Sequence, residues 1–194
     1  NRSIVDEAKR KMPDHIVAST VHSLAFAGID ERFKDRVTRD RMPSFELARR
    51  YRVMPMTFRI DGHANGELHA LTNNQVASLA YRGVTRFCES ADLVPAACHV
   101  PHVPALDWVD DRGRRHCENN DAIAAALVPL MNRMWADISN PHGPVPVSLD
   151  HVVKLYELSD FDLGIDVLLM DEAQDVNAVF ASICMKQVAR GTQL

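Results

Sequence analysis

The sequence predicts an α/β fold in which a parallel sheet is interrupted by a mostly helical insertion of roughly 100 residues. The first observation is the run Ile165–Met170, which is short, almost all apolar and β-branched at its start. Such a run is typical of a strand buried on both faces of a parallel sheet. The second is His15–Thr20, a β-prone run that precedes a helical pattern. The third is the long stretch between these runs, where apolar residues recur mostly at helical spacing.

The first part of the chain predicts short helices. Arg2–Met12 has apolar residues at helical spacing, and Val21–Ala27 continues as a helix up to the stop signal Gly28. Asp30–Arg41 is dense in charge, and we expect it to be exposed. Pro43–Tyr51 predicts another short helix.

The middle of the chain predicts two long helices. Asn74–Ala91 is amphipathic, and Asp121–Ile138 shows the clearest helical pattern, even with Pro129 inside it. Residues 94–117 hold three prolines and little periodicity, which indicates a loop or an irregular segment.

The last part returns to alternating elements. Asn140–Pro146 ends the preceding helix, and Ser148 is positioned to cap a helix that runs through Leu158. After the strand Ile165–Met170, Asp175 is expected to cap a helix that reaches Arg190 and closes at Gly191.

Composition excludes several classes of protein. The 194 residues are 46% hydrophobic and 25% charged, which is ordinary for a globular protein and excludes dominant disorder or a fibre. No run of roughly 18 apolar residues exists, so we expect no membrane span. The opening Asn1–Lys11 is charged and does not read as a secretory signal. Four scattered cysteines do not suit a disulfide scaffold, so the expected location is reducing and cytoplasmic.

Charge is distributed unevenly along the chain. The net charge is −4, yet residues 1–52 hold 12 Lys and Arg against 8 Asp and Glu, while the remainder holds 10 against 18. One interpretation of the basic span is contact with a DNA backbone, and the other is an ordinary solvated surface. The cations concerned are Arg32, Lys34, Arg36, Arg39, Arg41, Arg49, Arg50 and Arg52.

Two adjacent carboxylates follow the predicted strand Ile165–Met170. Ligands of open α/β sheets bind beyond the carboxyl ends of the strands. Asp171 is placed to hold Mg²⁺ that bridges phosphate oxygens, and Glu172 is placed to accept a proton from an attacking water. The alternative is that these acids merely decorate a strand end and cap the following helix.

Two segments resemble motifs of one enzyme family. Val167–Asp175, which reads Val-Leu-Leu-Met-Asp-Glu-Ala-Gln-Asp, resembles the Walker B segment of superfamily 1 DNA helicases of the UvrD/Rep type. Thr20–Phe26 is similar to the Thr-x-His-Ser-x-Ala motif of the same family and follows a β-prone run, as it does there. The opening Asn1–Ala8 resembles the end of the motif that precedes it.

Looser similarities point within the family to the F-box DNA helicase group and its prokaryotic or phage relatives. They lie at Phe87–Asp92, His99–Pro101 and Leu149–Leu158. The resemblance implies a partial RecA-like, P-loop NTPase sheet. Residues 1–40 and 148–194 would be two parts of RecA-like domain 1A, and residues 41–147 would be the helical insertion domain 1B.

The resemblance also implies roles for particular residues. Asp171 would bind Mg²⁺ and Glu172 would be the general base, while Gln174 and Asp175 would couple the ATP site to neighbouring motifs. The single-stranded DNA side would comprise Asn1, Thr20, His22 and Ser23, since hydroxyl and imidazole groups can donate to phosphate oxygens. For His22 the alternative is a buried histidine at a helix start that binds no ligand.

The phosphate-binding loop of the family is absent from these residues. A P-loop requires a glycine followed by lysine, and no glycine in the chain precedes one. We therefore expect a fragment of an ATP-dependent DNA helicase, cut between the P-loop and the third family motif, that alone neither binds ATP tightly nor hydrolyses it. The complete protein would use ATP and Mg²⁺ to translocate on single-stranded DNA and unwind duplex, with recombination or repair proteins as possible partners.

Other interpretations remain open. The chain could instead be a non-hydrolysing remnant that binds single-stranded DNA or a protein, or part of a nuclease-fused or recombination-complex homologue. A zinc site is a further candidate, although the spacing of its residues fits no common framework. Its ligands would come from Cys98, His99, His102, His116 and Cys117.

Overall fold

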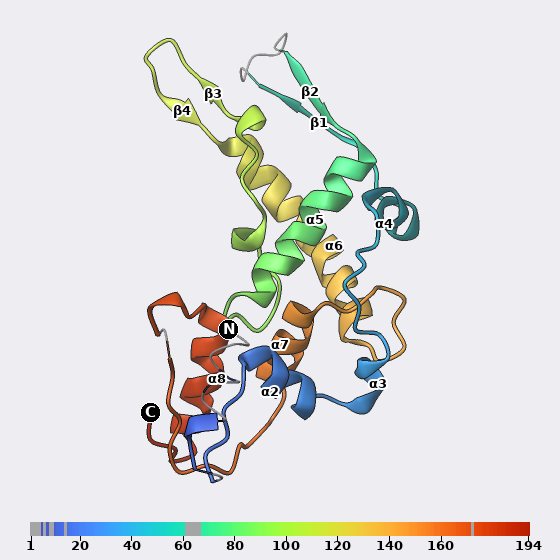
Figure 1. Ribbon diagram of the computed structural model, residues 1–194. Helices are drawn as coiled ribbons and strands as arrows, with labels where there is room; N and C mark the ends of the chain where they lie inside the picture. The colour runs from blue at the N-terminus through green and yellow to red at the C-terminus, as the bar shows by residue number, and fades with distance from the viewer. Residues whose placement is uncertain (1–4, 6, 8–9, 14, 61–66, 172) are drawn as a thin grey trace. The chain divides into compact units, whose positions relative to one another are not determined.

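The chain is described by a computed structural model that covers residues 5, 7, 10–13, 15–60, 67–171 and 173–194 (Figure 1). Helices dominate, and two small antiparallel sheets of two strands each accompany them, so the protein is a mixed α/β protein. It divides into two compact units. Unit 1 consists of Asn1–Arg39, Cys88–Ala91 and Val147–Leu194, and unit 2 consists of Asp40–Phe87 and Asp92–Pro146.

Unit 1 is built on the packing of helices from both ends of the chain (Figure 1). Its helices are α2 (Val21–Gly28), α3 (Glu31–Lys34), α7 (Leu149–Leu158) and α8 (Ala178–Val188). Their apolar faces form one core, which excludes water from Ala25, Ile29, Phe33, Val147, Val152, Val153, Tyr156, Val179 and Ile183. An isolated parallel bridge between Val37 and Val147 joins the two chain segments beside this core.

The starts of α2 and α7 follow from their capping residues. The Thr20 side chain accepts a hydrogen bond from the backbone N–H of Ser23, and Ser148 accepts one from the N–H of His151. Each bond satisfies a donor that the first turn of a helix would otherwise leave unpaired. Both helix starts were predicted, and the structure confirms them.

Gly28 allows α2 and α7 to approach closely. A Cβ atom at this position would lie 2.4 Å from Cε2 of Tyr156, whose ring is buried and stacks on Phe161 at 4.0 Å between centroids. Gly83 in unit 2 is also crowded, but its neighbour there is Sδ of Met131, at the end of a flexible side chain.

Gly28→Ala is therefore expected to lower the free energy of unfolding by about 1–3 kcal/mol, because the packed ring has little room to move. Gly83→Ala is the matched control, with a smaller loss because Met131 can change rotamer and alanine favours a helix. Urea denaturation followed by circular dichroism compares the two. Equal losses would mean that the ring contact does not limit substitution at Gly28.

The predicted strand Ile165–Met170 differs from expectation. This segment forms no strand, and the only β pairing it makes among the described residues is a parallel bridge between Val167 and Gln193. The side chains of Val167 and Leu169 are 51% and 79% exposed, so the segment is not buried on both faces. A strand becomes buried only when neighbouring strands and helices cover it, and an apolar run does not supply those neighbours. His15–Thr20 is likewise outside any strand.

The last helix begins later than predicted. Asn177, rather than Asp175, is the N-cap of α8, and its side chain accepts from the N–H of Phe180. Asp175 belongs instead to a short 3-10 helix, Ala173–Asp175. The helix also ends earlier than predicted, at Val188 with Ala189 as its C-cap, and Gly191 has a positive φ of 103° two residues after that cap.

Unit 2 is built on two long helices, α5 (Asn73–Cys88) and α6 (Glu118–Ser139). They meet where Met131 packs over Gly83 and where the rings of Phe87 and Trp135 lie edge to face, 5.2 Å apart. Proline is tolerated at position 129 of α6, as predicted. The other elements of unit 2 are α4 (Ser44–Tyr51), β1 (Met56–Arg59), β2 (Leu68–Leu71), β3 (Trp108–Val109) and β4 (Arg115–His116).

Both hairpins of unit 2 lie at the same end of its helix pair (Figure 1). In the first, Met56 pairs with Leu71, and in the second Trp108 pairs with His116. The buried side chain of Asn120 fixes the loop before β3, because it accepts from the N–H of Val103 and donates to that residue's carbonyl and to Asp107.

Some predictions fall at or beyond the limits of the described residues. Of the predicted helix Arg2–Met12, the structure describes Val5, Glu7, Arg10 and Lys11 as helical. No helix in the described part of the chain is both long and apolar enough to cross a membrane.

Candidate functional site

The segment that resembles Walker B ends in an exposed carboxylate. Leu168 donates its N–H to the carbonyl of Gln193 at 2.8 Å, and Gln193 donates to the carbonyl of Asp166 at 2.9 Å. These bonds hold the chain at residues 166–168, three residues before the bend where Asp171 is exposed, and Gln174 is exposed in the following 3-10 helix. Glu172 and Asn1 lie outside the described residues, and Asp175 is placed by its backbone alone.

The three other residues predicted for DNA contact lie together at the start of α2. The hydroxyls of Thr20 and Ser23 are 2.9 Å apart and share one hydrogen bond, whichever of them donates. That arrangement leaves the other hydroxyl hydrogen available to an outside acceptor. His22 is not buried: its side chain is 45% exposed, and its Nε2 lies 3.3 Å from Oδ1 of Asp150. The alternative of a buried histidine is therefore wrong.

The start of α2 and the segment that ends at Asp171 both belong to unit 1, but different residues hold each of them in place. The Thr20–Ser23 turn is held by its own cap and by the packing of α2 on α7, whereas the chain before Asp171 is held by Gln193. Chemically, the first group offers hydroxyl and imidazole donors to phosphate oxygens. The exposed carboxylate of Asp171 is a ligand of the hard oxygen type that Mg²⁺ prefers.

Unit 1 contains a buried charge network that sequence reasoning did not predict. Lys154 and Glu157 are 0% and 1% exposed and lie one turn apart on α7, with Nζ 2.9 Å from Oε2. Lys154 also donates to the carbonyl of Ser90, while Glu157 accepts from Ser182 and pairs with Lys186. Burial would raise the pKa of the Glu157 carboxyl, but the bonds from Lys186, Lys154 and Ser182 hold it below its usual range.

The basic span divides between the two units. In unit 1, Arg32 makes a bidentate ion pair with Asp30, and Lys34 forms an ion pair with Glu31. In unit 2, no ion pair between described residues involves Arg49, Arg50 or Arg52. Among the described residues of the span, Arg49, Arg50 and Arg52, like Arg39 and Arg41, therefore stay available to an anionic partner.

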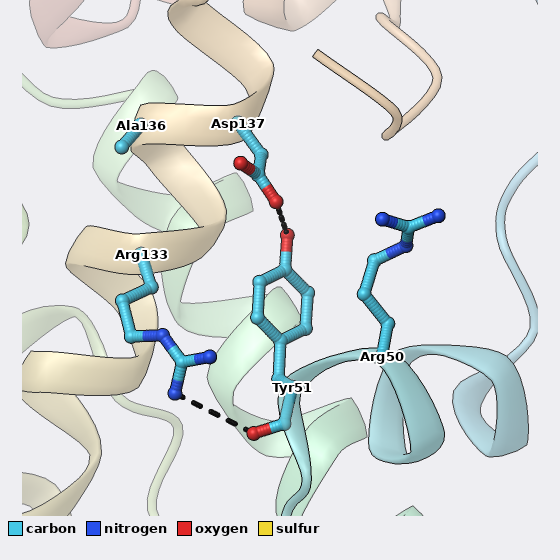
Figure 2. A pocket seen from close by; sticks show the side chains of 5 residues that line it. All are labelled: Arg50, Tyr51, Arg133, Ala136 and Asp137. Atoms are coloured by element: carbon cyan, nitrogen blue, oxygen red, sulfur yellow. Dashed lines mark hydrogen bonds between the residues drawn. The ribbon is translucent and has the colours of Figure 1, made fainter.

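A hollow of about 300 Å³ lies between α4 and α6 in unit 2 (Figure 2). The guanidinium groups of Arg50 and Arg133 lie on either side of the Tyr51 ring. The phenol of Tyr51 donates to Oδ2 of Asp137 at 2.7 Å, and Arg133 stacks over the ring with 5.4 Å to its centroid. Burial, followed by the bond to Asp137, raises the pKa of the Tyr51 phenol, so this group stays protonated.

The proposed zinc ligands do not assemble. Among the described residues, only Asp92, Cys98 and His99 bring possible ligand atoms within 4.8 Å of one another. Nδ1 of His99 accepts the backbone N–H of Ala96, which leaves its proton on Nε2, facing Asp92 at 2.8 Å. A ring nitrogen that holds its proton cannot bind a metal. His102 and His116 instead pair with Asp107 and Asp110.

No protein-family model, curated protein or solved structure matches this chain.

Proposed function

We propose that this chain is part of a superfamily 1 DNA helicase of the UvrD/Rep type, with unit 1 as part of its first RecA-like domain and unit 2 as the insertion. The observation that best supports the proposal is the start of α2. There the Thr-x-His-Ser motif exposes an imidazole and leaves one hydroxyl hydrogen available, in the unit that also exposes Asp171.

In this proposal each group has a separate task. The exposed carboxylate of Asp171 would hold Mg²⁺, which when bound neutralises the phosphates of ATP. Glu172 would accept the proton of the attacking water, and Gln174 and Asp175 would link the ATP site to the DNA side. Thr20, His22 and Ser23 would donate to phosphate oxygens of a single DNA strand. The complete enzyme would turn ATP hydrolysis into movement along that strand.

The proposal predicts that the chain binds single-stranded DNA through the start of α2. Replacing both His22 and Ser23 by alanine should weaken binding of a fluorescent 20-residue oligothymidine roughly 2–10-fold, because hydrogen bonds to phosphates are lost. Fluorescence anisotropy gives the dissociation constants. Neither change removes the Thr20 cap, so circular dichroism should show an unchanged fold.

His15→Ala is the matched control, because His15 is an exposed histidine shortly before the same helix. It should bind like the wild type. If the double variant also binds like the wild type, the start of α2 is not part of a DNA site and the proposed function loses its main support.

A further inference from the structure

One face of α4 combines an exposed aromatic ring with arginines. Phe45 is 61% exposed, and Arg49 lies one turn after it, followed by Arg52 at the helix end. Residues spaced by four and then three positions lie on the same side of a helix. Leu47, Ala48 and Tyr51 fill the opposite, buried side. The exposed ring of Phe45 therefore lies beside cations instead of packing in the core.

The hollow beside α4 adds two further cations, but on another side of the helix, because Arg50 follows Phe45 by five positions, about 140° around the helix, and adjoins the buried Tyr51. Arg50 and Arg133 flank Tyr51, and the single lining carboxylate, Asp137, already accepts the Tyr51 phenol (Figure 2). Glu46 is the one acid of α4. Four arginines thus outnumber two acids over α4 and the hollow, and this part of unit 2 should attract anions.

Arg52 provides an independent observation. It is the only non-glycine residue with positive φ among those the structure describes, with φ 51° and ψ 48° at the C-cap of α4. Glycine is the residue that most easily adopts this conformation at a helix end. Arg52 thus places a cation next to Arg49 and Arg50 in a conformation that costs backbone strain.

We propose that Phe45, Arg49, Arg50, Arg52 and Arg133 form a binding surface for single-stranded nucleic acid, here called the α4 surface. The guanidinium groups of Arg50 and Arg133 bind backbone phosphates at the hollow, and Phe45 stacks on a base. Bases of a single strand are free to stack on a protein ring, whereas those of a duplex already stack on each other. The inference deepens the proposed function by adding, in unit 2, a DNA contact separate from that of His22.

The test compares variants of the full chain by anisotropy with the same oligothymidine. Arg50→Ala combined with Arg133→Ala should weaken binding roughly tenfold or more at 0.1 M salt and reduce the log–log salt slope by about 1.4, the value for two lost phosphate contacts. Phe45→Ala should weaken binding of the single strand but not of a duplex of equal length. Arg32→Ala is the matched control, because Arg32 is already paired with Asp30.

Arg52→Gly separates binding from folding. It should weaken binding of the oligothymidine while leaving the Tm unchanged or higher, because glycine relieves the positive φ. A purely structural role for Arg52 predicts the opposite, a lower Tm with unchanged affinity.

The outcomes of the two proposals are distinguishable. If the α4 variants bind like Arg32→Ala while the His22 and Ser23 variant binds weakly, the α4 surface is wrong and the proposed function stands. If the α4 variants alone bind weakly, the surface is correct and the start of α2 is not a DNA site. Absence of binding, or preference for duplex, overturns the α4 surface.

Discussion

Glu157→Gln is expected to lower the free energy of unfolding by about 3–5 kcal/mol, as measured by urea denaturation at neutral pH. The carboxylate lies between the ammonium groups of Lys154 and Lys186, and Lys154 is fully buried. Glutamine has nearly the same shape but no charge, so the buried Lys154 would lose its compensating partner. Breaking a buried ion pair is costly because the remaining charge is kept from water.

Two comparisons make this expectation specific. Glu31→Gln breaks the exposed pair with Lys34 and should cost less than about 1 kcal/mol. Combining Glu157→Leu with Lys154→Met should cost less than Glu157→Gln alone, because no buried charge is left without its partner. A loss below about 1 kcal/mol for Glu157→Gln would show that water or a shifted Lys154 compensates the charge.

The same group gives the wild type a pH dependence. The folded-state pKa of Glu157 is lowered, so its stabilising contribution is complete above the unfolded pKa of about 4.3 and is lost as pH falls through the folded value. Glu157→Gln removes this component. The stability difference between the two proteins should therefore shrink toward low pH.

Phe87→Ala is expected to lower the stability of unit 2 by about 3–5 kcal/mol. Phe87 is fully buried, and its ring makes edge-to-face contacts with the rings of both His99 and Trp135. Removing it leaves a cavity that two rigid rings cannot fill. Phe87→Leu keeps most of the volume and should cost less.

Tryptophan fluorescence can measure the unfolding of unit 2 separately from that of unit 1. Both, Trp108 and Trp135, belong to unit 2, so their fluorescence reports that unit, while circular dichroism reports helices of both. Phe87→Ala should lower the denaturation midpoint seen by fluorescence. An unchanged fluorescence midpoint would mean that the surrounding helices close the cavity.

Local signals predicted most helices, because capping and periodicity act over a few residues. The helix α2 begins at Val21 and Ser148 caps α7 as expected, and Pro129 does not break α6. The predicted cap of α8 was wrong, because Asn177 and not Asp175 is the N-cap. Both side chains can accept hydrogen bonds from the N–H groups of a first turn, and the sequence does not show which of them does so.

Long-range packing was much harder to predict. The apolar run Ile165–Met170 indicates a buried strand only if other strands cover it, and the structure exposes Leu169 instead. Lys154 and Glu157 are spaced like an ordinary surface pair on a helix, so nothing local reveals that they are buried. At the candidate site, the exposure of His22 followed from the motif interpretation, whereas its neighbour Asp150 is 128 residues away and was not anticipated.

The separation between His22 and Asp150 also has a consequence for synthesis on the ribosome. Translation at about 5–20 residues per second requires roughly 6–25 s to add the 128 residues between them. Through this interval α2 has been made, but α7, which covers its apolar face, has not. All residues of unit 2 are also made before α7 begins at Leu149, so unit 2 is complete while unit 1 still lacks α7. We therefore expect nascent α2 to be a binding target for chaperones until α7 emerges.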